Sequence, residues 1–188
     1  MGYDIAIVGA GPAGASAAIF AAKAGKKTLL LDNGKSITKK AWIKNHYGVD
    51  DIEGPDLLET GLEQAKKFGA EFKEEEVQHI SKVGDGFKLE TENGTYDAKH
   101  VILATGLYVD LAEKIGLETK PATEPRIKTV LVVNEKGETS TKGIWAAGTI
   151  AGVSVHTIIT AGDGAKVAIN VISELNGERY VDHDIIQS

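Results

Sequence analysis

Residues 3–14, YDIAIVGAGPAG, give the clearest indication of how this chain folds. The first six, in which Asp4 is the only charged residue, are typical of a buried parallel strand. The glycines that follow have the GxGxxG spacing, and an alanine-rich helix is predicted after them. Gly9 lets the chain turn tightly out of the strand, Gly11 lets a pyrophosphate approach the backbone, and Gly14 lets the helix lie close to the sheet. The free N–H groups at the start of that helix favour phosphate binding.

A second apolar run, residues 28–31, is predicted to be the next parallel strand. It ends at Asp32, 23 positions after Gly9, which is near the ~20 expected for an acid that accepts a hydrogen bond from an adenosine ribose. The alternative is an ordinary βαβ unit in which the glycines serve packing and Asp32 is solvated. Because strand, glycines, helix and acid occur in the right order, the sequence favours dinucleotide binding.

The composition narrows the class of protein. The chain has 188 residues with 42% hydrophobic and 26% charged residues, and its net charge is −6. This net charge argues against the basic face that nucleic-acid binding needs, so no nucleic-acid partner is expected. The absence of cysteine excludes disulfides, thiolate nucleophiles, CxxC redox pairs and cysteine-ligated metals.

The expected location is cytoplasmic, without membrane attachment. A core strand is predicted from Tyr3, so no signal peptide is expected before it, and no apolar run approaches the ~20 residues of a membrane span. Lys39, Lys40 and Lys44 cluster around Trp42. This cluster is either solvated surface or a patch that receives an acidic partner.

The predicted fold class is α/β: a Rossmann-like, three-layer domain with a small antiparallel β excursion, formed by residues 1–188 as one domain. Residues 33–55 are expected to be polar and irregular, and Asp56 is expected to cap a helix over 57–68. The excursion is predicted from segments 71–76, 77–83, 87–91 and 95–99. A central parallel strand over 101–104, a connector with at most one short helix near 111–115, strands over 127–134 and 143–148, and a helix over 156–175 complete the prediction.

Four stretches in order resemble the flavin-binding domain of the thioredoxin reductase-like pyridine nucleotide-disulfide oxidoreductases. They are IVGAGPAG at 7–14, LATG at 103–106, GIWAAG at 143–148 and ITAGDGA at 159–165. NHYG at 45–48 stands where that family has a flavin-lining turn, and FGAEF at 68–72 follows the equivalent helix. The resemblance covers nearly the whole chain and implies that the cofactor is FAD.

Three departures from that family bear on function. Only 36 residues, 107–142, separate the two stretches between which full-length reductases insert an NADPH-binding domain, and no second GxGxxG occurs there. The redox CxxC is absent. Thr149 stands where the family usually has an aspartate that accepts a bond from the ribitol; threonine can still accept, and it removes an anion near the phosphates. FAD binding is expected despite Thr149, and the effect of the threonine on the affinity is left open.

The resemblance also implies which residues contact the cofactor. The pyrophosphate lies on the glycine-rich turn, the adenosine on the residues around Asp32 and Val77, and the ribitol near Thr149. The start of the last helix points at the flavin C2 carbonyl. The implied set is Gly9, Gly11, Pro12, Ala13, Gly14, Asp32, Asn33, Asn45, Val77, Ala104, Thr105, Gly106, Gly148, Thr149, His156 and Thr157.

His156 is the one catalytic candidate. It either donates a proton to the flavin or stabilises its reduced, anionic form, or it is a helix-start histidine with a satisfied hydrogen bond. His46 either lines the flavin loop or lies on the surface. The spacing of the remaining histidines does not suggest a metal site, and none is expected.

Two functions remain open. The first is an FAD-dependent oxidoreductase that receives electrons from transiently bound NAD(P)H or from a redox partner protein, as a monomer or a homodimer. The second is a non-catalytic dinucleotide-binding module, or a subunit of a larger reductase. NAD in place of FAD at the glycine-rich turn is a weaker alternative, because the Gly148 strand and the last helix offer the second contact region that an extended flavin needs.

Overall fold

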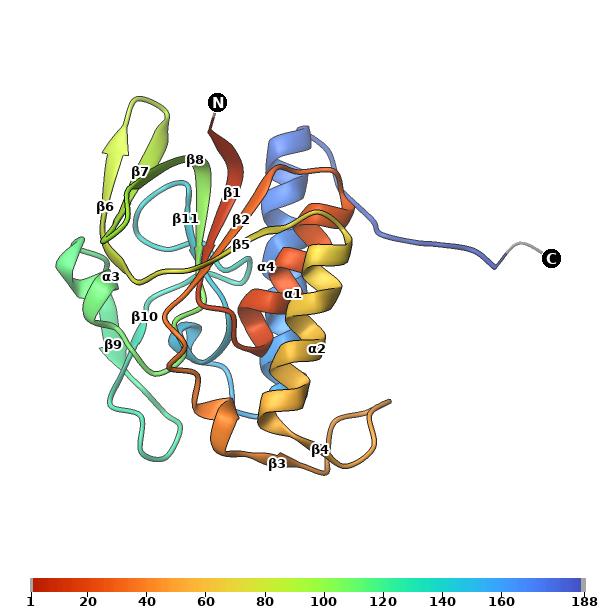
Figure 1. The fold of residues 1–188 in the computed structure, drawn as a ribbon. Helices are drawn as coiled ribbons and strands as arrows, with labels where there is room; N and C mark the ends of the chain where they lie inside the picture. The colour runs from red at the N-terminus through yellow and green to blue at the C-terminus, as the bar shows by residue number, and fades with distance from the viewer. Residues whose placement is uncertain (1, 187–188) are drawn as a thin grey trace.

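The computed structural model describes residues 2–186 and confirms the α/β class. The N-terminal βαβ unit forms as predicted (Figure 1). It consists of β1 (Tyr3–Val8), α1 (Pro12–Lys23) and β2 (Thr28–Asp32). The last helix, α4 (Thr157–Asn176), also forms at the predicted place and ends at Gly177, whose φ of +73° is a left-handed conformation suited to glycine.

The main sheet has the strand order β5 (Glu71–Glu74), β2, β1, β8 (Thr95–Leu103), β7 (Gly86–Thr91), β6 (Val77–Val83), and β11 (Ile144–Ala146) pairs with the second half of β8 on the side opposite β1. The strands that run parallel are β1, β2, β5 (Glu71–Glu74), the second half of β8 (Thr95–Leu103) and β11 (Ile144–Ala146). Val8 pairs with Leu31 on one side and Leu103 on the other, and Leu103 pairs with Ala146. Four strands therefore end at one edge of the sheet, which is where ligands bind in open α/β sheets.

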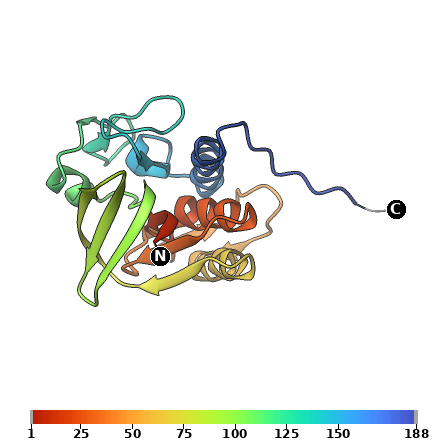
Figure 2. The same ribbon diagram turned by 90° about the horizontal axis from the view of Figure 1, so that it is seen from above.

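The three predicted layers are present (Figure 2). Alternate residues of β1 serve two cores because side chains of a strand point to opposite faces. Ile5 and Ile7 pack with α1 and α4 on one face, whereas Ala6 and Val8 pack with Phe87 on the other. The first face is covered by α1, α2 (Gly54–Lys67) and α4. The second face is covered by β6 (Val77–Val83), β7 (Gly86–Thr91) and the first half of β8.

Glycines allow α1 to approach both the sheet and α4 closely. A Cβ on Gly14 would lie 1.7 Å from the Gly9 carbonyl oxygen, so the predicted role of Gly14 in close packing is confirmed. A Cβ on Gly164 of α4 would lie 2.0 Å from the Ala13 carbonyl oxygen. Both distances are shorter than any real van der Waals contact, so these two positions require glycine.

The region 33–55 is more ordered than predicted. It contains a 3₁₀ turn at Ile37–Lys40 and a short hairpin of β3 (Trp42–Ile43) and β4 (Ile52–Glu53). The helix α2 begins earlier than predicted, with Glu53 at the N-cap, so the prediction that Asp56 caps it is wrong. The reason is tertiary: the Gly54 N–H donates to the Ala41 carbonyl at 2.9 Å, and Gly54 lies too close to Thr38 for any side chain.

Three strand predictions are also corrected. The segment at 71–74 joins the parallel sheet beside β2, so it is not part of the antiparallel excursion. Segments 95–99 and 101–104 form one strand, since β8 pairs with β7 along its first half and with β1 along its second. The connector contains an unpredicted strand, and the strand expected over 127–134 is shorter. The elements there are α3 (Asp110–Lys114), β9 (Thr119–Pro121) and β10 (Thr129–Leu131).

Within residues 2–186, the longest helices are not apolar enough to cross a lipid bilayer.

The hydrogen bond between Trp145 and His100 is expected to make the stability of the fold depend on pH. The Trp145 Nε1–H donates to His100 Nδ1 at 3.1 Å, which requires that nitrogen to be unprotonated. Burial lowers the pKa of His100 below its ordinary value of 6.5, and Lys142 and Lys99 add to the effect while Glu174 opposes it. The unfolded chain therefore binds this proton more readily, and the contribution of His100 is complete above pH 6.5 and is lost as the pH falls below it.

We expect His100→Asn to reduce the acid sensitivity of the protein, because the amide oxygen can accept from Trp145 without titrating. The wild-type protein should lose about 1 kcal/mol more than the variant between pH 7.5 and pH 5, the value of one hydrogen bond. Urea unfolding at both pH values measures this difference. Parallel pH dependences of the two proteins would contradict the assignment.

Candidate functional site

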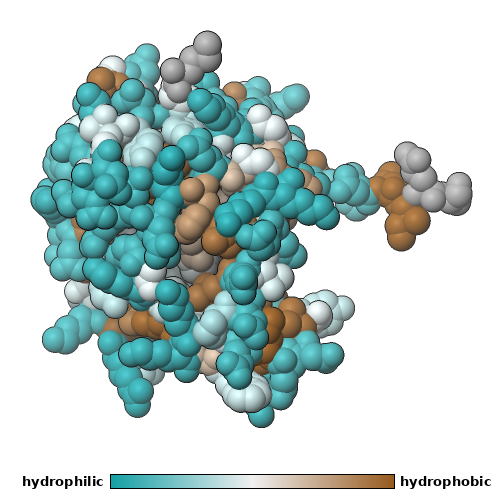
Figure 3. Space-filling model, in the orientation of Figure 1, coloured by the Kyte–Doolittle hydropathy of each residue, from teal (hydrophilic) through white to brown (hydrophobic). Residues whose placement is uncertain are grey.

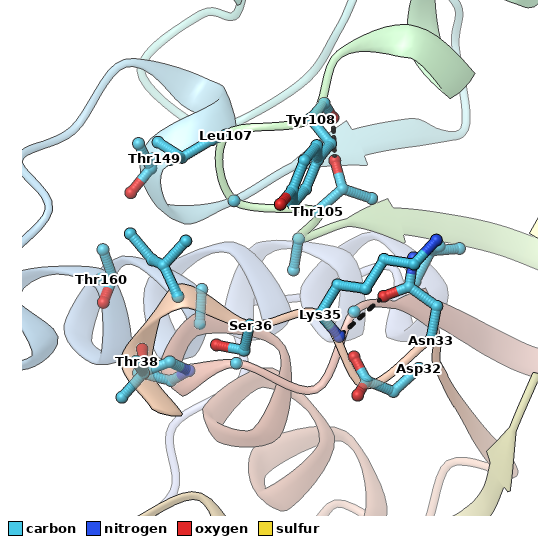
Figure 4. Close-up of a pocket in the computed structure, with 18 of the residues that line it drawn as sticks. Asp32, Asn33, Lys35, Ser36, Thr38, Thr105, Leu107, Tyr108, Thr149 and Thr160 are labelled. Carbon is cyan, nitrogen blue, oxygen red and sulfur yellow. Dashed lines mark hydrogen bonds between the residues drawn. The ribbon is translucent and has the colours of Figure 1, made fainter. Parts of the chain in front are cut away.

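A cavity of about 530 Å³ lies at the carboxyl ends of the parallel strands. Its walls come from the turns that follow β1, β2, β8 and β11, from the segment before β6, and from the start of α4. In Figure 3, brown apolar surface is visible in a hollow near the middle of the face shown. In Figure 4, labelled residues face one another across the cavity, with Asp32 and Asn33 at one end and Thr149 and Thr160 at the other. The cavity is therefore elongated and bounded by segments from both halves of the chain.

The glycine-rich turn forms one wall with its backbone. Gly9 has φ +103°, which allows the tight turn predicted for it. Gly11 lines the cavity, and a Cβ there would meet only Ser36 Oγ, at 3.4 Å. Gly11 is also the N-cap of α1, where no side chain caps the helix. The first-turn N–H groups, with the positive end of the helix dipole, are thus left for an anion.

Asp32 ties this turn to the next one. Its Oδ1 accepts from the Ala10 N–H at 2.8 Å, and its Oδ2 accepts from the Gly34 N–H at 2.9 Å. A carboxylate oxygen has two lone pairs, so each can accept one more bond from a ligand hydroxyl. Next to it, the side-chain Oδ1 of Asn33 accepts from the Lys35 backbone N–H at 3.2 Å (Figure 4). Asp32 therefore shapes the cavity as well as lining it.

A tight turn after β8 forms the opposite wall. Thr105 Oγ1 donates to the Tyr108 carbonyl at 2.6 Å, and the Tyr108 N–H donates to the Thr105 carbonyl at 3.2 Å. Gly106 within the turn has φ +65°. The two bonds hold Tyr108 in place beside the cavity.

At the far end, a buried acid positions the turn after β11. Asp163 Oδ2 accepts from the Gly148 N–H at 2.8 Å, and its Oδ1 pairs with Lys166 Nζ at 2.6 Å. Gly148 is packed against Ala13, and Thr149 after it lines the cavity. The role of Asp163 was not predicted from the sequence, although it lies in the ITAGDGA stretch.

We expect Asp163→Ala to lower the free energy of unfolding by about 1–3 kcal/mol, because it leaves the buried Gly148 N–H without an acceptor. Asp163→Asn is the matched control, since its carbonyl oxygen can still accept that bond and the loss should be smaller. Urea unfolding measures both. Equal losses in the two variants would show that the Gly148 bond is not what Asp163 contributes.

The structure brings twelve of the sixteen predicted residues to the cavity wall. These are Gly9, Gly11, Pro12, Ala13, Asp32, Asn33, Val77, Ala104, Thr105, Gly106, Thr149 and Thr157. Gly14 and Gly148 lie behind the wall, where the absence of a side chain allows close packing. Their direct contact with a cofactor stays a prediction.

Asn45 and His156 are placed away from the wall. Asn45 is exposed in the loop between β3 and β4. His156 is exposed at the N-cap of α4, and its Nδ1 lies 2.8 Å from Ser154 Oγ, which donates to Glu124 at 3.1 Å. This geometry matches the alternative of a helix-start histidine with a satisfied hydrogen bond.

The other histidines and the basic cluster are also placed. His46 Nδ1 lies 3.0 Å from Thr157 Oγ1, so it links the β3–β4 loop to the start of α4 without lining the cavity. Lys44 pairs with Asp51 at 3.6 Å and lies over the Trp42 ring, which makes the cluster less basic than its sequence suggests. Across residues 2–186, the acidic and histidine side chains form no group of three that could hold a metal ion.

The sequence patterns did not predict several of the residues that line the cavity. The length of the segment after β2 was the only signal for Lys35, Ser36 and Thr38, which line the cavity from that segment. Tyr108 follows the LATG stretch, but nothing in the pattern predicted that it would line the cavity. Lys35 Nζ also pairs with Glu76 at 3.0 Å, at the Asp32 end of the cavity.

Comparison with known proteins gives one family and a set of relatives. The family model described as pyridine nucleotide-disulphide oxidoreductase matches residues 3–110 and 59–165. A thioredoxin reductase of Listeria monocytogenes is 39% identical over 108 residues, covering 55% of this chain and 34% of that protein. A thioredoxin reductase of Helicobacter pylori is 38% identical over 109 residues, covering 55% and 35%. The chain spans about a third of the length of these curated relatives.

Solved structures share the fold at low sequence identity. A thioredoxin reductase from Gloeobacter violaceus has a TM-score of 0.81 at 19% identity, covering 98% of this chain and 99% of that one. The atypical thioredoxin reductase TRi from Desulfovibrio vulgaris Hildenborough has a TM-score of 0.83 at 20% identity, covering 93% and 98%. At these identities the likeness establishes a common fold.

Proposed function

This chain belongs to the pyridine nucleotide-disulphide oxidoreductase family, and from that premise we propose that it is an FAD-binding flavoprotein oxidoreductase of the thioredoxin reductase-like type. Thioredoxin reductase-like members of the family are FAD-binding flavoproteins. One observation carries the proposal: a single elongated cavity is bounded by the glycine-rich turn after β1 and by the segments at Thr149 and Thr157. An extended dinucleotide needs both regions.

The residues present fit FAD. Gly11 leaves open the space over the backbone that a pyrophosphate would need, since a Cβ there would enter the cavity. Asp32 keeps acceptor capacity for ribose hydroxyls at one end, and Thr149 offers a hydroxyl at the other. NAD would use the glycine-rich turn and Asp32 but would leave the far end at Thr149 without a role, which favours FAD.

In this proposal the protein binds and orients the cofactor, and FAD supplies the electron-transfer chemistry when it is bound. The start of α1 holds the phosphates through its free N–H groups. Thr157 lines the cavity at the start of α4, where the positive end of the helix dipole stabilises negative charge. His156, exposed and bonded to Ser154, is not included as a proton donor.

The electron donor is proposed to come from outside the chain. The connector between β8 and β11 contains α3, β9 and β10, without a second βαβ unit that could bind a nicotinamide nucleotide. We also propose that residues 1–188 form one FAD-binding domain and that the protein is cytoplasmic. Electrons then enter from transiently bound NAD(P)H or from a redox partner protein, with homodimer formation as a further prediction.

The second candidate is a non-catalytic module or a subunit of a larger reductase, favoured by the missing nicotinamide domain. Steady-state assays with NADH or NADPH and a dye acceptor separate the two candidates. Turnover well above that of free FAD supports the oxidoreductase. A protein that holds FAD but turns over no faster than free FAD with either nucleotide, and that reduces no acceptor after chemical reduction, is a module.

A further inference from the structure

Tyr108 is a cavity-lining side chain that the proposed function leaves without a role. It is 49% exposed even though it lies in the wall of a cavity. Ile37 and Val155 line the same cavity and are also among the exposed large hydrophobic residues. Apolar surface that is turned toward a cavity and left uncovered by the protein is suited to cover by a ligand.

The backbone holds Tyr108 in a defined position. The reciprocal hydrogen bonds with Thr105, at 2.6 and 3.2 Å, close the turn that carries it. The turn is anchored to β8 on one side, and α3 begins two residues after Tyr108 on the other. The ring therefore extends into the cavity from a short turn that two hydrogen bonds close. Little conformational entropy should be lost when a ligand covers it.

The part of the cavity that Tyr108 faces is the part near Asp32. In Figure 4 its ring projects into the cavity opposite Lys35 and Ser36. Lys35 extends from there toward Glu76, with which it pairs at 3.0 Å and which precedes Val77 in the wall. Asp32, Lys35 and Val77 belong to the end that the proposed function gives to the adenosine.

We propose that Tyr108 forms an aromatic wall over the adenosine half of the bound nucleotide and thereby selects adenine dinucleotides over flavin mononucleotide. The inference rests on the proposed function for the orientation of the ligand. The physical basis is that an aromatic side chain stacks on any purine, and the stacked face removes apolar surface from water. The phenolic hydroxyl has no part in it.

The test compares dissociation constants for FAD, ADP and FMN in three variants. Tyr108→Ala removes the ring, and Tyr108→Phe keeps the ring but removes the hydroxyl. Phe68→Ala is the matched control, because Phe68 is an aromatic residue that is 40% exposed and does not line the cavity. Thermal unfolding of each variant shows whether it is folded.

Tyr108→Ala is expected to weaken FAD and ADP to the same extent, between about fivefold and about a hundredfold, and to leave FMN unchanged. Tyr108→Phe and Phe68→Ala are expected to bind all three like the wild type. An equal loss for FAD and FMN would place the ring on the isoalloxazine and overturn the proposal. Equal losses in the alanine and phenylalanine variants, or no loss in either, would overturn it too.

The binding measurements can reject the proposed function and the role of Tyr108 separately. Wild-type protein that binds ADP but not FAD removes the proposed function, while the ADP measurements still decide the role of Tyr108. Wild-type protein that binds FAD normally, with no change on removing the ring, removes only the role of Tyr108. Wild-type protein that binds neither nucleotide removes both.

Discussion

Gly11→Ala should weaken FAD binding by roughly 10- to 100-fold, or about 1.4–2.8 kcal/mol, without unfolding the protein. The backbone at Gly11 has φ −67° and ψ −175°, which alanine adopts without strain. Its Cβ would meet only Ser36 Oγ at 3.4 Å, so the fold has room for it. The methyl group would instead occupy the cavity where the pyrophosphate is proposed to approach the backbone.

Fluorescence titration with FAD measures the affinity, and urea unfolding of the cofactor-free protein measures the stability. Gly162→Ala is a matched control, because a Cβ there has no neighbour within 4 Å and Gly162 does not line the cavity. The control should bind FAD like the wild type. A Gly11→Ala variant with unchanged stability and unchanged FAD affinity would contradict the placement of the pyrophosphate.

Gly164→Ala should lower the free energy of unfolding by about 3 kcal/mol or more. Its Cβ would lie 2.0 Å from the carbonyl oxygen of Ala13, a backbone atom of a buried helix start that cannot rotate away. The two helices would have to separate where they cross, and their buried contacts would be lost along α1 and α4. The effect should appear in the cofactor-free protein.

Gly162→Ala is also the matched control for Gly164→Ala, because Gly162 and Gly164 lie two residues apart in the helix α4. Gly162→Ala should be neutral or stabilising by up to about 1 kcal/mol, because alanine costs less backbone entropy in a helix than glycine. Urea unfolding of the wild type and of the two alanine variants measures their free energies of unfolding. Similar stabilities for the two alanine variants would show that α1 and α4 do not cross as closely as described.

The elements that the sequence predicted best are those whose pattern is local. The N-terminal βαβ unit follows from an apolar run, a glycine-rich turn and an alanine-rich helix, and α4 follows from its small residues and the terminal Gly177. The strand at 71–74 was assigned to the wrong part of the sheet because its sequence, EFKE, does not encode a partner. Its pairing with β2 depends on where α2 returns the chain.

The sequence predicted those residues of the site that belong to a local motif. Backbone-lined positions such as Gly9 and Gly11 follow from glycine spacing, which reflects a requirement of the turn itself. Asn45 and His156 were transferred by resemblance, and tertiary contacts place them outside the cavity wall. Asp163 and Tyr108 were missed because their roles depend on hydrogen bonds to residues in other turns or on the direction of a side chain.

The proposed function places one extended flavin dinucleotide in the cavity, from Asp32 to Thr149. Its most direct test is to load the purified protein with FAD, remove the excess, release the bound nucleotide by heating and identify it by chromatography and absorbance. We expect a yellow protein that releases FAD at about one equivalent per chain. A colourless protein that retains no FAD, or one that binds only NAD, would contradict it.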